Sequence, residues 1–183
     1  MYTNTEFNSW VDKNVNTLDY VIMEPPCFSR TPQPLWAHVS LIDIFQSFRV
    51  NYLFMWVEAT TLPTLFTGYL ESDYEFRTLF PWIKVTKTDS LFCSLTTSAK
   101  NSVEYLVVFQ KPGAPKLKFN DGTVIVDEQD TIRHKPRKWE EYLHKQLSYS
   151  GLEGIYIYST GTYENLKSTD VDSTPTVHKT ELF

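Results

Sequence analysis

The sequence has little cysteine, little glycine and no long apolar run, and each shortage excludes a class of protein. The two cysteines, Cys27 and Cys93, fit no metal-ligand spacing and predict no disulfide framework, which favours a reducing compartment. The six glycines form neither a phosphate loop nor a Gly-x-Gly-x-x-Gly loop, and no Gly-x-Ser-x-Gly motif is present. No apolar run reaches the roughly 18 residues of a membrane span, so we expect no membrane protein, and we expect no secretory leader.

Histidine and net positive charge are also scarce. His38, His134, His144 and His178 are scattered, and with the cysteines they make no metal-binding spacing, so we expect no metal site. The formal net charge is −5, from 17 basic and 22 acidic residues. Contact with nucleic acid would therefore have to come from a local basic patch or from a partner protein.

What the chain does contain is enough apolar material for one domain. Of its 183 residues, 42% are hydrophobic and 15% are aromatic. Residues 1–158 are predicted to form that domain, and the polar segment 159–183 is expected to be weakly ordered. Within residues 1–17, the strong core candidates are Trp10 and Val11.

Unbroken apolar runs alternate with helical patterns along the chain. The runs predict strands over 18–24, 50–57, 80–86, 103–110 and 155–158. Helices are predicted over 37–48, from 61 to about 72–74, and over 139–147, and an Asn120-Asp121-Gly122 turn predicts a hairpin over 116–126. The alternation indicates an α/β fold with a mostly parallel central sheet flanked by helices, which binds ligands beyond the carboxyl ends of its strands.

The first of these strands runs directly into the turn Glu24-Pro25-Pro26-Cys27. A carboxylate and the carbonyl between two prolines can accept both N–H bonds of an exocyclic amine, and the prolines hold these acceptors in place. An aromatic residue after the prolines would stack on the extruded base. Here Glu24 is one methylene longer than Asp, and an error of about 1 Å can reduce the rate on the order of 100-fold. Cys27 offers no flat face, and an ordinary turn that ends a strand is the alternative interpretation.

Several further motifs follow this turn in one order. They are Tyr52-Leu53-Phe54-Met55-Trp56-Val57, Phe76-Arg77, Pro81-Trp82-Ile83-Lys84, the segment from Glu104 to Gly113, His134-Lys135-Pro136 and Trp139-Glu140-Glu141-Tyr142. Over roughly residues 10–158 the chain resembles the N6-adenine methyltransferase family typified by the eukaryotic mRNA adenosine methyltransferase. The resemblance implies a Rossmann-like methyltransferase fold. It also implies that the acid-Pro-Pro turn is the target-amine site, and that the Trp-Ile-Lys segment lies near the substrate groove.

The departures from the family pattern concern the chemistry. Active members carry Asp-Pro-Pro-Trp where this chain has Glu24-Pro25-Pro26-Cys27, and the segment 159–165 does not match the one that holds S-adenosylmethionine. The chain is therefore most similar to the degenerate, non-catalytic subunits of the family, and among them to that of the ciliate DNA adenine methyltransferase complex. The resemblance implies a pseudoenzyme in the nucleus that pairs with an active subunit. It implies no catalytic residue and no cofactor in this chain, with S-adenosylmethionine expected in the partner, and DNA as the nucleic acid.

Two basic clusters are the candidate nucleic-acid contacts. They comprise Lys111, Lys116 and Lys118 in one, and Arg133, Lys135, Arg137 and Lys138 in the other. Such side chains would neutralise phosphates without reading sequence. The alternative is an ordinary solvated loop, because runs of charge are common on protein surfaces.

Many aromatic residues are expected in the core, and any excess could form a large apolar contact with a partner subunit. We expect the helix over 62–74 and the segment 78–86 to form part of that face. Two alternatives to a non-catalytic subunit stay open: an active methyltransferase that uses Glu24, and a regulatory α/β binding module unrelated to nucleic acids.

Overall fold

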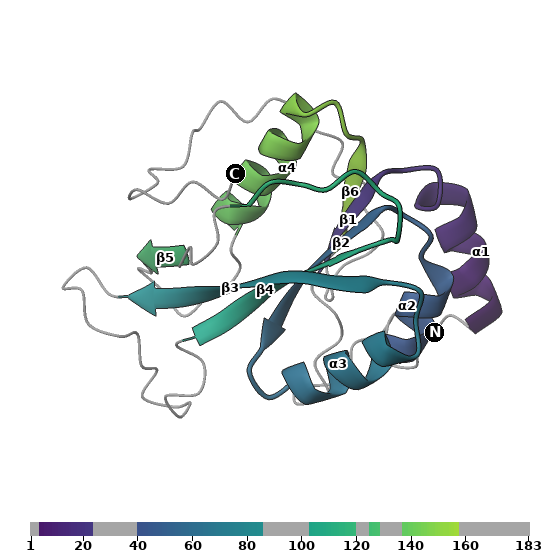
Figure 1. Ribbon diagram of the computed structural model, residues 1–183, viewed down its shortest axis with the longest axis horizontal. Coiled ribbons are helices and arrows are strands. Elements are labelled where there is room, and N and C mark those ends of the chain that lie inside the picture. The colour runs from purple at the N-terminus through teal and green to yellow at the C-terminus, as the bar shows by residue number, and fades with distance from the viewer. Residues whose placement is uncertain (1–3, 24–39, 86–102, 120–124, 129–136, 158–183) are drawn as a thin grey trace.

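The computed structural model describes residues 4–23, 40–85, 103–119, 125–128 and 137–157 (Figure 1). The elements in these ranges are, in chain order, α1 (Asn4–Asn14), β1 (Tyr20–Met23), α2 (Leu41–Ser47), β2 (Tyr52–Glu58), α3 (Leu62–Leu70), β3 (Glu75–Val85), β4 (Val103–Gln110), β5 (Ile125–Glu128), α4 (Arg137–Tyr149) and β6 (Gly154–Ile157). The predicted division between residues 1–158 and 159–183 stays a prediction, because the second segment lies outside these ranges.

The strands form one six-stranded sheet in the order β5-β3-β4-β2-β1-β6. β1 is parallel to both β2 and β6, and β3 is parallel to β5. β4 is antiparallel to both of its neighbours, β2 and β3. All strands except β4 therefore run in one direction, and the predicted α/β class is confirmed with a mixed sheet in which β4 is the exception.

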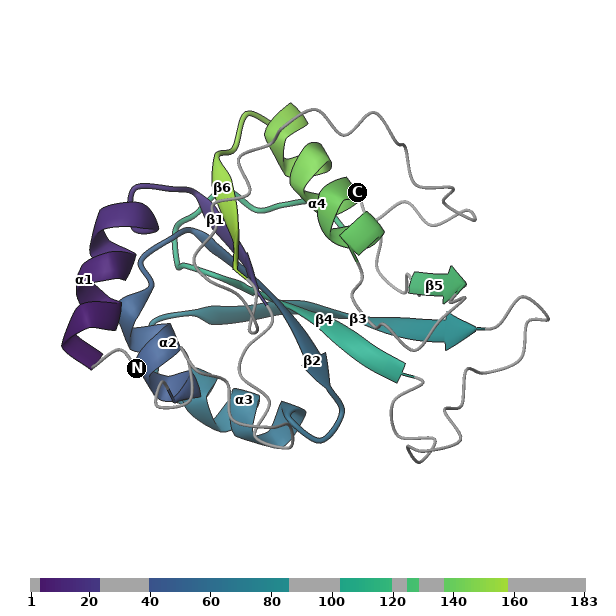
Figure 2. The same cartoon turned by 180° about the vertical axis from the view of Figure 1, so that it is seen from behind.

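Helices cover the sheet on both faces, as the continuous apolar runs predicted (Figure 2). On the first face, Val21, Met23 and the odd-numbered apolar residues of β2 pack against α1, α2 and α3. On the second face, Tyr20, Ile22 and the even-numbered residues of β2 pack against α4 and the segment 111–119. β1, β2 and β4 thus contribute alternate side chains to two separate cores.

The start of α2 is fixed by a capping box. The Oγ atom of Ser40 accepts a hydrogen bond from the backbone N–H of Asp43 at 3.0 Å. The carboxylate of Asp43 accepts one from the backbone N–H of Ser40, also at 3.0 Å. This reciprocal cap satisfies two N–H groups that a helix start leaves unpaired, so α2 begins at Leu41 and not at the predicted residue 37.

The helix predicted to reach 72–74 ends earlier, at Leu70. The hydroxyl of Ser72 donates to the carbonyl of Tyr69 at 2.7 Å and accepts from the N–H of Tyr74 at 3.2 Å. Tyr74 then turns into the first core, where its hydroxyl lies 3.1 Å from the carbonyl of Phe48 and 2.8 Å from that of Val50. These bonds stop the helix because they engage groups that a further turn would need. β3 consequently starts at Glu75, before the predicted residue 80.

The hairpin predicted over 116–126 is wrong. β5 pairs in parallel with β3, and residues 116–119 form no strand. Pro112 and Pro115 lack the N–H groups that a ladder needs, and the side chains of Leu117 and Phe119 are drawn instead onto the second core. The Asn120-Asp121-Gly122 turn lies outside the described residues.

The remaining elements differ from the predictions mainly at their ends. The segment before residue 18 contains the helix α1, in which Val11 is buried and Trp10 is partly buried, as expected. Val15, just beyond α1, is fully buried and was missed. α4 extends two residues beyond the predicted 139–147 at each end, and β6 begins one residue before the predicted 155.

Candidate functional site

The carboxyl ends of the parallel strands meet at one edge of the sheet, here called the carboxyl edge. The last residues of these strands are Met23, Glu58, Val85, Glu128 and Ile157. β1 lies between β2 and β6 in the sheet; α2, which follows β1 in the sequence, lies on the first face, and α4, which precedes β6, lies on the second. Open α/β sheets bind ligands beyond the carboxyl ends of their strands.

β1, the strand that precedes the acid-Pro-Pro motif in the sequence, ends at this edge. Met23, which pairs with Met55 of β2 and Ile157 of β6, is the residue directly before the motif. Glu24, Pro25, Pro26 and Cys27 themselves lie outside the described residues, so their assignment as a degenerate amine site stays a prediction. The strand that leads to them is buried throughout.

The ionisable side chains described at the carboxyl edge are acidic. Glu58 of β2 pairs directly with Glu104 of β4, and Glu104 also pairs with Trp82 of β3. Glu104 is only 7% exposed, although carboxylates are rarely buried to that extent.

The two tryptophans nearest this edge belong to the core. Trp56 and Trp82 are 3% and 0% exposed, and their rings meet edge to face with centroids 5.4 Å apart. The indole Nε1 of Trp56 is buried without a hydrogen-bond acceptor. Neither indole face is open to stack on an extruded base. The prediction that most of the aromatic residues are core is confirmed for these two and for Tyr52, Phe54, Phe80 and Phe109.

Lys111 lies at the opposite edge of the sheet from the carboxyl ends. It follows the last residue of β4, the one strand that runs the other way, and its N–H donates to the carbonyl of Asn51 at 2.8 Å. Its ammonium group is 3.7 Å from the carboxylate of Asp73 and 4.5 Å from the ring centroid of Tyr74. The structure therefore engages Lys111 with α3–β3 neighbours, apart from the carboxyl edge.

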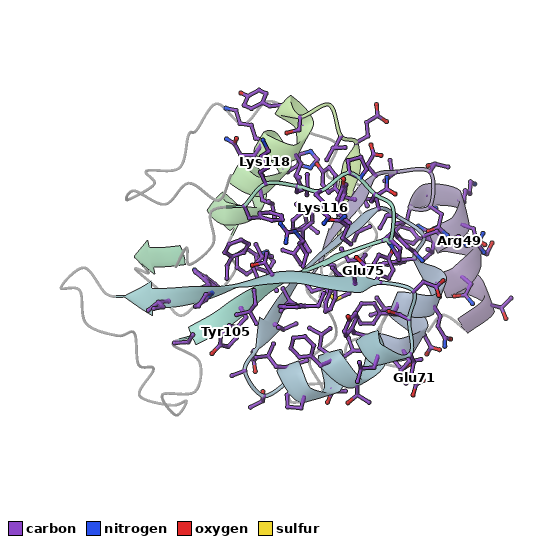
Figure 3. All side chains as sticks on the ribbon, viewed as in Figure 1. Arg49, Glu71, Glu75, Tyr105, Lys116 and Lys118 are labelled. Carbon is purple, nitrogen blue, oxygen red and sulfur yellow. The ribbon has the colours of Figure 1, made fainter. Side chains whose placement is uncertain are left out.

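Lys116 and Lys118 are both exposed, on the side of the sheet that carries α4 (Figure 3). Their segment is held down by alternate residues, because Leu117 and Phe119 pack on the second core, with Phe119 5.5 Å from Phe80. The hydroxyl of Tyr52 donates to the carbonyl of Pro115 at 2.5 Å, and burial raises the pKa of this phenol. The two lysines are thus presented outward by a fixed backbone.

The second basic cluster surrounds the start of α4. Arg137 and Lys138 are its first two residues, and the preceding Arg133 and Lys135 lie outside the described residues. Positive charge in the first turn opposes the helix dipole by roughly 0.3–1 kcal/mol. The cluster therefore has no evident benefit for the helix itself.

A buried tyrosine and a histidine connect α4 to β1, and no sequence pattern singled them out. The Oη atom of Tyr20, which is fully buried, lies 2.5 Å from Nδ1 of His144. Burial raises the pKa of Tyr20 to about 12, although a hydrogen bond with Ser148 opposes the shift, and burial lowers the pKa of His144. Both groups are neutral at pH 7, so the phenol donates and the imidazole accepts.

Gly154 makes the place for that tyrosine. A Cβ atom at Gly154 would lie 2.3 Å from two ring carbons of Tyr20, far inside van der Waals contact. The neighbouring chain is held by the carboxylate of Asp19, which accepts from the N–H of Glu153 at 2.9 Å. Glycine at 154 is thus required because β6 passes directly beside the aromatic ring.

An exposed apolar surface lies where α3 passes into β3, and it is called the α3–β3 patch. It consists of Phe66, Leu70 and Phe76, with Leu70 78% and Phe76 42% exposed and the rings of Phe66 and Phe76 5.5 Å apart. The patch belongs to the helix that was expected to face a partner. By contrast, Phe80 and Trp82 of the segment 78–86 are buried in the second core and present no surface.

Two other classes of site receive no support in the ranges that the structure covers. Those residues contain no group of three or more potential metal-ligating side chains. None of the described helices is long and apolar enough to cross a membrane.

Comparison with known proteins gives similarity in fold. No protein-family model matches the chain, and no curated protein matches it. The crystal structure of the M1.HpyAVI–SAM complex superposes with a TM-score of 0.51 at 11% identity, covering 86% of this chain and 79% of that one. A crystal structure of M1.HpyAVI covers 86% and 77%, with a TM-score of 0.49 and 11% identity. The chain therefore shares a methyltransferase-like fold with M1.HpyAVI.

Proposed function

We propose that this chain is a non-catalytic, methyltransferase-like subunit that heterodimerises with an active N6-adenine methyltransferase. It stabilises that subunit and helps to bind nucleic acid, for which we propose DNA, in the nucleus. The observation that carries the proposal is the end of β1. This strand ends at the carboxyl edge, in a fold shared with M1.HpyAVI, and the altered motif Glu24-Pro25-Pro26-Cys27 comes next in the sequence.

The residues that follow β1 and β6 in the sequence support a lost activity. Active members of the family that the chain resembles carry Asp-Pro-Pro-Trp where this chain has Glu24-Pro25-Pro26-Cys27, and the segment 159–165 does not match the one that holds S-adenosylmethionine. Cys27 offers no flat face to stack on an extruded base. We therefore assign S-adenosylmethionine to the partner and derive no catalytic step in this chain.

Contribution to nucleic-acid binding rests on the basic side chains of the second face. Lys116 and Lys118 point outward from a segment fixed on the core, and Arg137 and Lys138 open α4 beside it. The positive charges of Arg137 and Lys138 at the start of α4 reduce the stability of that helix locally, which is consistent with a role in binding phosphate. Arg133 and Lys135 extend this cluster in the sequence. Lys111, although included in the prediction, is engaged with Asp73 and Tyr74.

A calorimetric titration of the isolated chain with S-adenosylmethionine tests the central part of the proposal. We expect no heat of binding at micromolar concentrations, whereas the active partner should bind under the same conditions. Micromolar binding by this chain would contradict the proposal. A methyl-transfer assay on adenine-containing oligonucleotides supplies the second arm, in which the chain alone should give no product. Product that disappears on Glu24→Ala would establish the chain as an enzyme.

The nucleic-acid role has its own test in the assembled complex. Lys116→Ala with Lys118→Ala should weaken DNA binding about equally for unrelated sequences and make the salt dependence shallower by about two phosphate contacts. Lys145→Ala, which removes an exposed lysine farther along α4, is the matched control. An unchanged salt slope in the double variant would exclude these two lysines from the interface.

A further inference from the structure

The α3–β3 patch has a distinctive charged border. Glu71, Asp73 and Glu75 occupy alternate positions in the turn that joins Leu70 to Phe76, and all three are exposed. Figure 3 shows Glu71 and Glu75 on the side of the molecule where α3 ends and β3 begins. Lys111 approaches only Asp73, at 3.7 Å, and the carboxyl side chain of Asp73 is still 90% exposed. Arg77, close to this turn in β3, is an exposed cation.

The patch itself is continuous and fixed in place. Phe66 and Leu70 are one turn apart on α3 and so share a face of the helix. Phe76 contacts Phe66 at 5.5 Å and Phe109 at 6.2 Å between ring centroids, which anchors it to the first core. An apolar centre with a charged rim is the general plan of a protein–protein interface.

The neighbouring edge of β3 is closed to strand addition. β5 pairs with β3 only from Trp82 to Val85, which leaves the first part of β3 without a partner on that side in the described chain. On its other side, the ladder of β3 with β4 shifts register between Phe76 and Thr78, which marks a bulge in β3 at Arg77, and Pro81 has no N–H to donate. A bulge, a charge and a proline are the features that prevent edge-to-edge pairing. A partner must therefore dock through side chains.

Association of two copies through this patch is also unfavourable. A symmetric dimer places the same patch on both sides of the interface, so the acidic rim of one copy would face that of the other. Like charges brought together at a rim cost affinity and slow the encounter. The occupant has to carry the opposite charge.

We propose that the α3–β3 patch docks a different chain with a methyltransferase-like fold, whose apolar contact surface is bordered by lysine and arginine. The acidic rim excludes a second copy of this chain and selects that partner. The inference rests on the proposed heterodimer and adds which surface is used and which charge the partner presents there.

The test uses the purified chain and an active methyltransferase subunit that carries an intact Asp-Pro-Pro-Trp motif. Leu70→Ser should reduce affinity on the order of tenfold or more, because it removes an apolar contact at the centre of the patch. Glu71→Lys with Glu75→Lys should reduce affinity about tenfold at low salt, mainly through slower association, with a smaller effect near 0.5 M salt. The same charge reversal should change neither the circular dichroism spectrum nor the thermal midpoint of the chain, since both side chains are exposed.

Matched controls lie elsewhere on the surface. Tyr149→Ser removes a side chain that is 73% exposed, and Glu153→Lys reverses an exposed acid in the turn before β6. Both should leave affinity unchanged. If wild type binds and the patch variants bind equally well, the assignment of this surface is wrong while the heterodimer stands. If the wild-type chain forms no complex, both the proposed function and the proposed docking surface are wrong. Sedimentation of the wild-type chain alone should show a monomer. A dimer that Leu70→Ser abolishes would contradict the proposal that the acidic rim excludes a second copy of this chain.

Discussion

The two faces of the sheet are built in different ways. The first face is covered by three helices that meet in a cluster of aromatic rings, where Phe45 contacts Tyr69, Tyr74 and Phe109 with centroids 4.9–6.4 Å apart. Among the described residues, the second face is covered by α4 and by the irregular segment 111–119. Its core is the smaller of the two in the described chain, and it contains two close contacts, those of Tyr20 with His144 and with Gly154. We therefore expect substitutions on the first face to act through apolar packing, and those at Tyr20 and Gly154 to act through these two contacts.

Loss of the central aromatic ring on the first face should have the largest effect. Phe45→Ala removes a side chain that is 2% exposed, and we expect the free energy of unfolding to fall by about 3–5 kcal/mol. Phe45→Leu keeps most of the volume and should lower it by less than about 1.5 kcal/mol. Urea denaturation of both variants measures the difference. Equal losses for the two would mean that ring packing does not organise this face.

A single methyl group should have a nearly comparable effect on the second face. Gly154→Ala places a Cβ atom 2.3 Å from the Tyr20 ring, and we expect a loss of about 3 kcal/mol. Gly113→Ala is the control, since a Cβ there meets nothing within 4 Å and only the positive φ of 83° opposes it. Combining Gly154→Ala with Tyr20→Ala should give a smaller loss than the sum of the two. Strict additivity would show that the close approach is not the cause.

Removal of one hydroxyl tests the link between β1 and α4. Tyr20→Phe keeps the ring but leaves Nδ1 of His144 without its donor, and we expect a loss of about 1–2 kcal/mol. Relative to the wild type, the variant should lose more protection from amide hydrogen exchange in α4 than in α2. Unchanged protection of α4 would mean that apolar packing by Leu143 and Leu147 alone holds the helix.

The contrast between the faces also explains what the sequence could predict. Periodicity and apolar runs predicted part of every strand, because the burial pattern is a local property, but they did not predict that β5 pairs with β3. The end of α3 depends on Tyr74 reaching the carbonyls of Phe48 and Val50, more than twenty residues away, and no local pattern encodes that contact. The hairpin prediction failed for the same reason. The sequence Asp121-Gly122 favours a tight turn. Leu117 and Phe119 pack on the second core instead, and residues 116–119 form no strand.

The candidate site was predicted in unequal parts. The altered acid-Pro-Pro turn and the exposed lysines were identified from residue type alone. The burial of Glu104, the Tyr20–His144 contact and the exposure of Leu70 depend on which segments become neighbours. The capping box at Ser40 has a local signature, with Asp43 three residues later, and could have been found in the sequence.

That cap gives the next smaller effect, on the first face. Ser40→Ala should lower the free energy of unfolding by about 1 kcal/mol, because the N–H of Asp43 loses its acceptor. Thr61→Ala is the matched control, since Thr61 precedes α3 but its side chain makes no capping bond. A larger loss at Thr61 than at Ser40 would contradict the assignment of the caps.

The smallest effect expected is a dependence on pH that is confined to the second face. His144 has a lowered pKa in the folded state, so the unfolded chain takes up its proton first as the pH falls below about 6.5. Stability from this group is complete above that pH and is lost as the pH falls through the folded pKa. In His144→Asn this part of the profile should be flatter. If the free energy of unfolding depends on pH in the same way in His144→Asn and in the wild type, the loss of stability at low pH comes from other groups.

The central claim is that this chain keeps the fold of an adenine methyltransferase while its partner does the chemistry. The most direct measurement is an experimental structure of the co-expressed complex with S-adenosylmethionine added. We expect the ligand in the partner alone, with the α3–β3 patch buried between the two chains. Ligand density in this chain beside the carboxyl end of β1 would contradict the account.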